Sequence, residues 1–200
     1  MATDSKVIVR EVVLSYPFVF EARTQTGDDG KTKVSFNTAV VGKGAPPAAL
    51  VDALIQVGVD KWGEKFRDEI ALVRKKESEK YKWPIKPGAG KGYGEGTWYF
   101  NCSSKSQPGV VSRYKGPDGK PQPIKDPAEI YPGVIVNISV NAFAYEGRNA
   151  QGQVVSRGVS LGLGNIQKWA DGPRLDNRVA AEDEFEADTE ASGADLEDVL

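Results

Sequence analysis

Segments rich in β-branched and aromatic residues recur along the chain, and helical periodicity is confined to one stretch between the second and third of them. Turn-forming runs that contain Gly, Pro or Asp separate the segments, as is typical of paired strands. Several strands without alternating helices favour a closed or nearly closed antiparallel barrel over a doubly wound sheet. The expected strands are 7–14, 33–41, 97–103, 109–115, 134–145 and 154–164.

The helical stretch begins after Ala45-Pro46-Pro47 and runs to Val73. Its apolar residues recur every three or four positions, with Lys, Glu and Arg between them. One broken helix or two short ones fit this pattern, with the interruption expected near Gly58. The segment 83–96 is rich in Gly, Pro and Lys and predicts a long loop.

Charge is unevenly distributed along the chain. No Lys or Arg follows Arg178, whereas residues 180–200 hold 9 of the 28 acidic residues. Residues 1–179 therefore combine 26 cations with 19 carboxylates, a formal charge of +7, although the whole chain carries -2. This layout predicts a basic body at 1–179 that faces a polyanion. The segment 180–200 has too few apolar residues to bury a core, so we expect a disordered acidic tail there.

Histidine is absent and Cys102 is the single cysteine. An intrachain disulfide and His-based catalysis are therefore excluded, and metal sites built from thiolate or imidazole ligands fail with them. We expect no cofactor. The polar start at 1–6 and the lack of an apolar run near about 18 residues predict a cytoplasmic protein without membrane spans.

The strand 134–145 has two different faces. One face, from Val134 through Val140 to Ala144, is apolar and predicts core. The other combines amides, a hydroxyl and two rings, which suit stacking on bases and bonding to base edges or phosphates. A face covered by the inserted helix is the alternative. The second face comprises Ile135, Asn137, Ser139, Asn141, Phe143 and Tyr145.

The strand that starts at Thr97 repeats this logic. Trp98 and Cys102 are expected in the core, and Tyr99 is either a stacking residue or a half-buried sheet tyrosine. Cations interleave with rings in the next strand, which suits phosphate neutralisation combined with stacking. The predicted DNA-binding residues are Tyr93, Tyr99, Asn101, Lys105, Arg113, Tyr114, Lys115, Asn137, Asn141, Phe143 and Tyr145.

The run from Lys86 to Gly94 superficially matches the phosphate-binding loop of NTPases. The match fails because the first required Gly falls at Ile85, and Gly92 stands where Ser or Thr should bind magnesium. A flexible basic loop that carries Tyr93 and closes over a strand is the preferred interpretation, with an inert surface loop as the alternative.

Several stretches resemble the phage-encoded OB-fold single-stranded-DNA-binding proteins, formerly a domain of unknown function. The resemblance rests on 93–101, on Tyr131-Pro132-Gly133 and above all on 158–168, and Tyr16-Pro17 matches the N-terminal signature. It covers roughly 7–172, with Gly164 standing where the family pattern has Asn. It implies an OB-type barrel, a role in phage replication or recombination, and an acidic tail that contacts other replication proteins.

These observations predict a protein that covers exposed single strands without sequence preference during phage DNA replication, recombination or repair. The tail is expected to compete with DNA and to recruit partners through Asp195, Leu196, Glu197, Asp198, Val199 and Leu200. The sequence leaves the oligomeric state open, including a homo-oligomer. Two other classes remain: a protein-interaction scaffold, and a metal-dependent nuclease built on Asp118, Asp126 and Glu129, which lie in a Pro- and Gly-rich loop.

Overall fold

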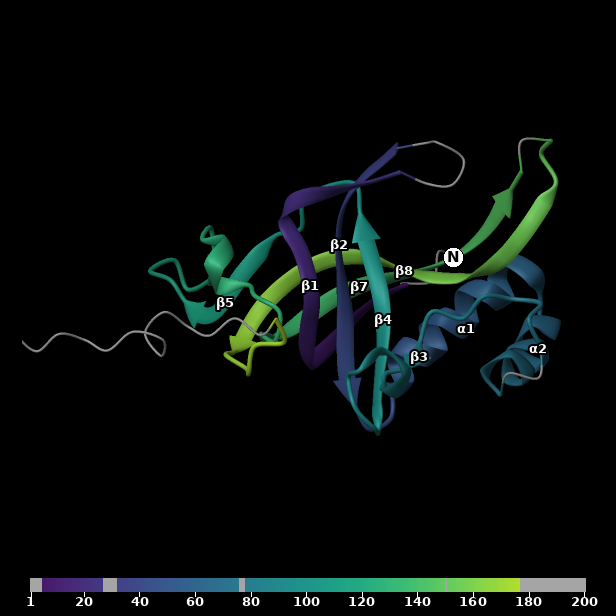
Figure 1. Cartoon of the computed structure of the whole chain (residues 1–200), viewed down its shortest axis with the longest axis horizontal. Coiled ribbons are helices and arrows are strands. Elements are labelled where there is room, and N and C mark those ends of the chain that lie inside the picture. The colour runs from purple at the N-terminus through teal and green to yellow at the C-terminus, as the bar shows by residue number, and fades with distance from the viewer. Residues whose placement is uncertain (1–4, 27–31, 76–77, 150, 177–200) are drawn as a thin grey trace, which may run out of the picture.

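The computed structural model describes residues 5–26, 32–75, 78–149 and 151–176. The acidic tail expected at 180–200 lies outside the described residues. The described residues form eight strands, two α-helices and two short 3-10 helices (Figure 1). In chain order these are β1 (Lys6–Thr26), β2 (Thr32–Lys43), α1 (Ala48–Trp62), α2 (Lys65–Arg74), β3 (Lys86–Pro87), η1 (Ala89–Lys91), β4 (Thr97–Ser104), β5 (Val110–Lys115), β6 (Pro121–Pro123), η2 (Pro127–Glu129), β7 (Ile135–Arg148) and β8 (Val154–Ala170).

Five strands close into a barrel. Neighbours follow the order β4-β2-β1-β7-β8, and an additional pairing between β4 and β8 joins the two ends of this series. The expected antiparallel barrel is corrected in one respect, because β8 runs parallel to β4 and also to β5. Five strands around a closed ring cannot all alternate in direction, so at least one neighbouring pair must be parallel. The result is the five-stranded Greek-key barrel of the OB-fold.

The core lies inside this barrel, on the strand faces that alternation predicts. Val136, Ile138 and Val140 of β7 are fully buried, and Trp98, Phe100 and Cys102 of β4 are buried as expected. β8 contributes Val159, Leu161, Leu163 and Ile166 to the same cluster. Alternation therefore identified the interior faces of β4 and β7 correctly.

The two helices form the predicted insertion between the second and third barrel strands, but the break between them is not at Gly58. α1 ends at Trp62 and is capped by Gly63, whose φ of 82° suits glycine and whose N–H donates to the carbonyl of Val59. Gly58 lies buried inside α1, where an added Cβ would come within 2.0 Å of the Phe66 ring. Gly58 thus permits close packing of α2 on α1, and Gly63 makes the turn.

The two ends of the molecule differ (Figure 1). The helices lie at one end, where Trp62, Phe66 and Tyr81 pack with ring centroids 4.9–5.2 Å apart. β5 and β6 extend the sheet at the other end, beyond β8. No helix among the described residues is sufficiently long and apolar to cross a membrane.

Candidate nucleic-acid interface

Two adjoining hollows lie on the outer face of the barrel, over β2, β4 and β8. We call them together the β2–β4 groove. The first has a volume of about 450 Å³ and is lined by Tyr16, Arg23, Lys33, Ser35, Asn37, Thr38, Ala39, Asn101, Cys102, Ser103, Ser160 and Leu161. The second has a volume of about 320 Å³ and is lined by Lys82, Trp83, Pro84, Lys86, Tyr99, Asn101, Tyr145, Val159 and Ser160. Asn101 and Ser160 belong to both, so the groove is continuous.

The described residues that line the groove carry charge of one sign. Its described lining residues include four cations and no carboxylate: Arg23 and Lys33 lie in one hollow, and Lys82 and Lys86 in the other. All four side chains are exposed. The segment after α2 supplies Lys82, which is held against β8 by a bond from its N–H to the carbonyl of Arg157. A groove whose described lining carries only cationic charge attracts a polyanion.

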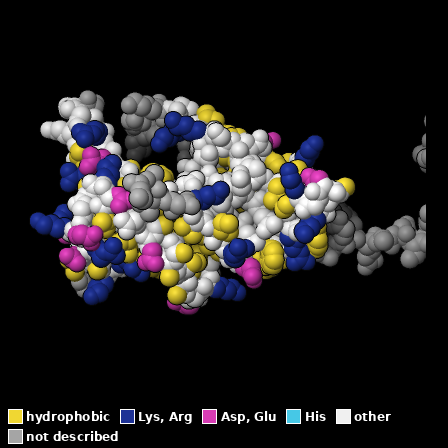
Figure 2. Space-filling model, turned by 180° about the vertical axis from the view of Figure 1, so that it is seen from behind, with side chains coloured by type: hydrophobic (Ala, Val, Ile, Leu, Met, Phe, Trp, Pro, Cys, Tyr) yellow, Lys and Arg dark blue, Asp and Glu magenta, His cyan; other side chains and the backbone are white. Residues whose placement is uncertain are grey.

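A larger hollow of about 540 Å³ lies at the other end of the barrel, between β5 and the end of β8. Its cations are matched by Asp126, Glu129 and Asp171. Lys168 binds both Glu129 and Asp171, and its hydrogen bond holds the pKa of the Asp171 carboxyl below the usual value. This hollow is larger than either half of the β2–β4 groove taken separately, but its balanced charge makes it the weaker site for DNA. Cations and carboxylates are likewise interspersed on the face shown in Figure 2.

Asn137 is buried, contrary to the expectation of a surface residue. Its Oδ1 accepts a bond from the N–H of Glu11 at 3.0 Å, and its Nδ2 donates to Gln167 at 2.9 Å. Glu11 lies where β1 shifts register against β7, between Val9 and Val12. A bulge leaves backbone groups without a ladder partner, so Asn137 has a structural task and is withdrawn from the predicted DNA contacts.

Tyr99 is also buried, with 7% of its surface exposed. β3 pairs beside it, with Lys86 opposite Tyr99, and the ring of Tyr93 lies against its ring. The ring therefore lies in the wall of the groove. Of the two alternatives for Tyr99, its burial favours the sheet tyrosine over the stacking residue.

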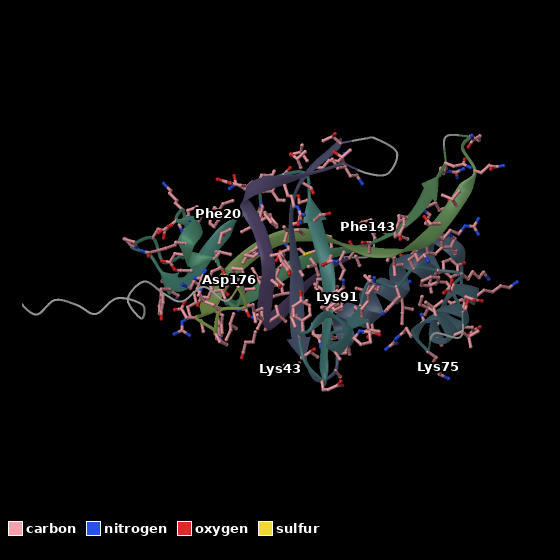
Figure 3. The ribbon with its side chains drawn as sticks, viewed as in Figure 1. Phe20, Lys43, Lys75, Lys91, Phe143 and Asp176 are labelled. Carbon is pink, nitrogen blue, oxygen red and sulfur yellow. The ribbon has the colours of Figure 1, made fainter. Side chains whose placement is uncertain are left out.

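The other predicted residues fall into two groups. Near the groove, Asn101 is exposed, Tyr145 lines the second hollow, and the exposed ring of Phe143 lies 6.5 Å from that of Tyr145. Figure 3 shows Phe143 on the ribbon of β7 and β8, between β4 and the hairpin that ends these strands. Outside the groove's lining are the exposed residues Lys105, Arg113, Tyr114, Lys115 and Asn141.

Arg113 and Tyr114 belong to the hollow at the β5 end. The guanidinium of Arg113 lies over two rings, 4.9 Å from the centroid of Tyr114 and 5.5 Å from that of Trp169. Lys115 ends the same strand. The structure therefore separates these three residues from the β2–β4 groove.

Several groove residues were missed from the sequence. Arg23 lies near the end of β1, Lys33 lies near the start of β2, and Trp83 lies in the expected loop after α2. In the structure, Arg23 of β1 pairs opposite Ser35 of β2, and Lys33 lies two positions before Ser35 on β2. The expected pairing of these two strands was the sequence signal that could have placed Arg23 and Lys33 on one surface. Only closure of β2 against β4 places these residues beside Asn101.

The carboxylates considered for a nuclease are engaged locally. Asp118 accepts a bond from the N–H of Lys120, Asp126 caps η2 through the N–H of Ala128, and Glu129 binds Lys168. Among the described residues, no group of three or more His, Cys, Asp or Glu side chains is placed to hold a metal ion.

A closed barrel in this strand order, with a cationic groove on its second and third strands, defines an OB-fold protein of the oligonucleotide-binding type. The sequence profile of the family described as "Enterobacter phage Enc34, ssDNA-binding protein" matches residues 5–197. The chain belongs to this family. No curated protein matches the sequence significantly.

Solved structures share the fold at low identity. The single-stranded DNA-binding protein from bacteriophage Enc34, in complex with ssDNA, is 20% identical with a TM-score of 0.52, and the match covers 86% of this chain and 90% of that one. Gp2.5, a single-stranded DNA-binding protein encoded by bacteriophage T7, is 14% identical with a TM-score of 0.55. That match covers 90% of this chain and 99% of gp2.5.

Proposed function

We propose that this protein binds single-stranded DNA in the β2–β4 groove, with little sequence preference, and covers exposed strands during phage DNA replication, recombination or repair. The observation that carries the proposal is a described lining with four cations and no carboxylate, on the face that OB-folds use for oligonucleotides. Membership in a family named for an ssDNA-binding protein supports it. The proposed role is binding without catalysis, in the cytoplasm of an infected bacterium.

Binding would combine phosphate and base contacts. Arg23, Lys33, Lys82 and Lys86 neutralise phosphates, and Asn101 bonds to the backbone or to base edges. The rings of Tyr93, Phe143 and Tyr145 stack on bases. Stacking and phosphate contacts both ignore base identity, so we expect little discrimination between sequences.

Lys105, Arg113, Tyr114, Lys115 and Asn141 lie outside the groove's lining. We propose that they contact DNA only where a strand continues past the groove. Arg113→Ala should then weaken binding of a long oligothymidylate and leave binding of one of about 8 nucleotides, within the site size of one OB fold, unchanged. Equal weakening for both lengths would place Arg113 within the primary site.

We propose further that the acidic tail competes with DNA and recruits replication or recombination proteins. Its nine carboxylates are tethered to the barrel and are opposite in charge to the four cations that line the groove. Asp195, Leu196, Glu197, Asp198, Val199 and Leu200 place apolar side chains among acids, which suits a basic partner with an apolar pocket.

A titration of fluorescently labelled single- and double-stranded DNA across a range of salt concentrations tests the main proposal. We expect tighter binding to the single strand. Four phosphate contacts at about 0.7 each predict a slope of log affinity against log salt of about -2.8. Binding that is absent, or flat with salt, would overturn the groove as a DNA site.

A further inference from the structure

The backbone of β1 adopts a positive φ at two non-glycine residues, Glu11 and Tyr16, both with φ of 50°. The register of β1 shifts at each position, between Val9 and Val12 against β7 and between Ser15 and Phe18 against β2. Bulges take up this conformation readily with glycine, but a bulky residue there is a conformational outlier. Pro17 adds to the constraint at Tyr16, because the residue before a proline is restricted towards extended conformations.

Packing does not account for a tyrosine at position 16. Its surface is 66% exposed, so burial of the ring cannot offset the unfavourable backbone. Strain that lacks such compensation is a feature of functional sites. The position of the ring therefore matters more than its contribution to the core.

The side chain of Tyr16 lines the groove. It shares the hollow of about 450 Å³ with Arg23 and Lys33, and the described lining of that hollow contains no carboxylate. An aromatic surface beside two cations suits a nucleotide, because the base can stack while the flanking phosphates are neutralised. Glu11 has the same φ but lies outside the groove's lining, with its N–H bonded to Asn137.

We propose that Tyr16 is a base-stacking platform, held out into the groove by the bulge of β1. A base of the bound single strand stacks on its ring, while Arg23 and Lys33 bind the neighbouring phosphates. This inference rests on the proposed function and adds a subsite to it at the end of the groove formed by β1 and β2.

The two positive-φ positions provide a matched experiment on the full chain. The variants are Tyr16→Gly, Tyr16→Phe and Glu11→Gly, and the probe is a labelled oligothymidylate of about 16 nucleotides, the upper site size of one OB fold. Tyr16→Gly should bind about 5- to 150-fold more weakly, the range for one lost stack, with a melting temperature no lower than the parent's. Tyr16→Phe should bind like the parent, and Glu11→Gly at least as tightly.

The outcomes separate this inference from the proposed function. Parental affinity in Tyr16→Gly would overturn the stacking platform while the groove stands. A marked fall in its melting temperature, or equal loss of binding in Tyr16→Phe, would also overturn it, because the ring would then be structural or the hydroxyl essential. Failure of the parent protein to bind the oligothymidylate would overturn the proposed function itself.

Discussion

The ring of Tyr93 lies 5.6 Å from the ring of Tyr99, centroid to centroid, at an interplanar angle of 59°. Tyr93 is half-buried in the loop that follows η1, whereas Tyr99 lies within β4 and is buried. The loop thus covers a strand residue whose side chain lies on the outer face of the barrel. The two tyrosines should therefore respond differently to truncation.

Tyr99→Ala should lower the free energy of unfolding by about 3 to 5 kcal/mol, because it leaves a cavity where a buried ring was. Tyr93→Ala should lower it by about 1 kcal/mol, the ordinary effect of a point substitution. Urea denaturation followed by circular dichroism measures both. Equal midpoints for the two variants would contradict the burial of Tyr99.

Replacing any one of Arg23, Lys33, Lys82 or Lys86 with Ala should weaken DNA binding and reduce the salt slope by about 0.7, because one phosphate contact is lost. Lys65→Ala, at an exposed position on α2, is the matched control and should change neither quantity. Affinity measured at several salt concentrations checks this. A similar effect in the control would mean that net charge, and not the groove, determines binding.

Phe143→Ala should weaken DNA binding by about 1 to 3 kcal/mol through the loss of one stack. Its thermal stability should remain close to the parent's, because the ring is 44% exposed. Leu72→Ala on α2, where the side chain is 42% exposed, controls for loss of exposed apolar surface. Normal binding by Phe143→Ala, or a large fall in melting temperature, would remove Phe143 from the proposed site.

Deleting residues 180–200 should tighten DNA binding, since nine carboxylates would no longer compete for the groove. The effect should be largest at low ionic strength, because salt screens competition between two polyanions for one cationic surface. A full-length variant with these nine residues changed to Asn or Gln should behave like the truncation. The same three proteins can be compared in pull-downs of replication enzymes. Equal DNA affinity of all three at low salt, together with equal amounts of enzyme recovered, would mean that the tail serves only to keep the protein soluble.

Burial raises the pKa of the Cys102 thiol from 9.0 to about 12. The neutral thiol is favoured in the folded state, so this contribution to stability is complete below pH 9.0 and declines as the pH rises towards about 12. We expect no labelling of the native protein by a thiol reagent near pH 8, and complete labelling in denaturant. Rapid labelling of the native protein would show that Cys102 is accessible from the groove.

Local patterns in the sequence determined much of the fold. Strand patterns located six of the eight described strands, although β1 and β8 continue to Thr26 and Ala170 and the short β3 and β6 were missed. Alternation placed Trp98 and Cys102 in the core, and helical spacing placed the insertion between the second and third barrel strands. These features depend on neighbours within a few residues, so their signals are present in any short window. The sequence also separates a basic body from an acidic segment, because charge is a property of composition.

Tertiary structure decided which surfaces remain open. Asn137 and Asn101 are both amides on the polar parity of a strand, yet a bulge of β1 buries the first and the groove exposes the second. Arg23 and Lys86 lie more than sixty positions apart in the chain and line one groove only because β2, β4 and β8 close together. Periodicity tells which face of a strand is apolar, but long-range pairing determines what covers the other face.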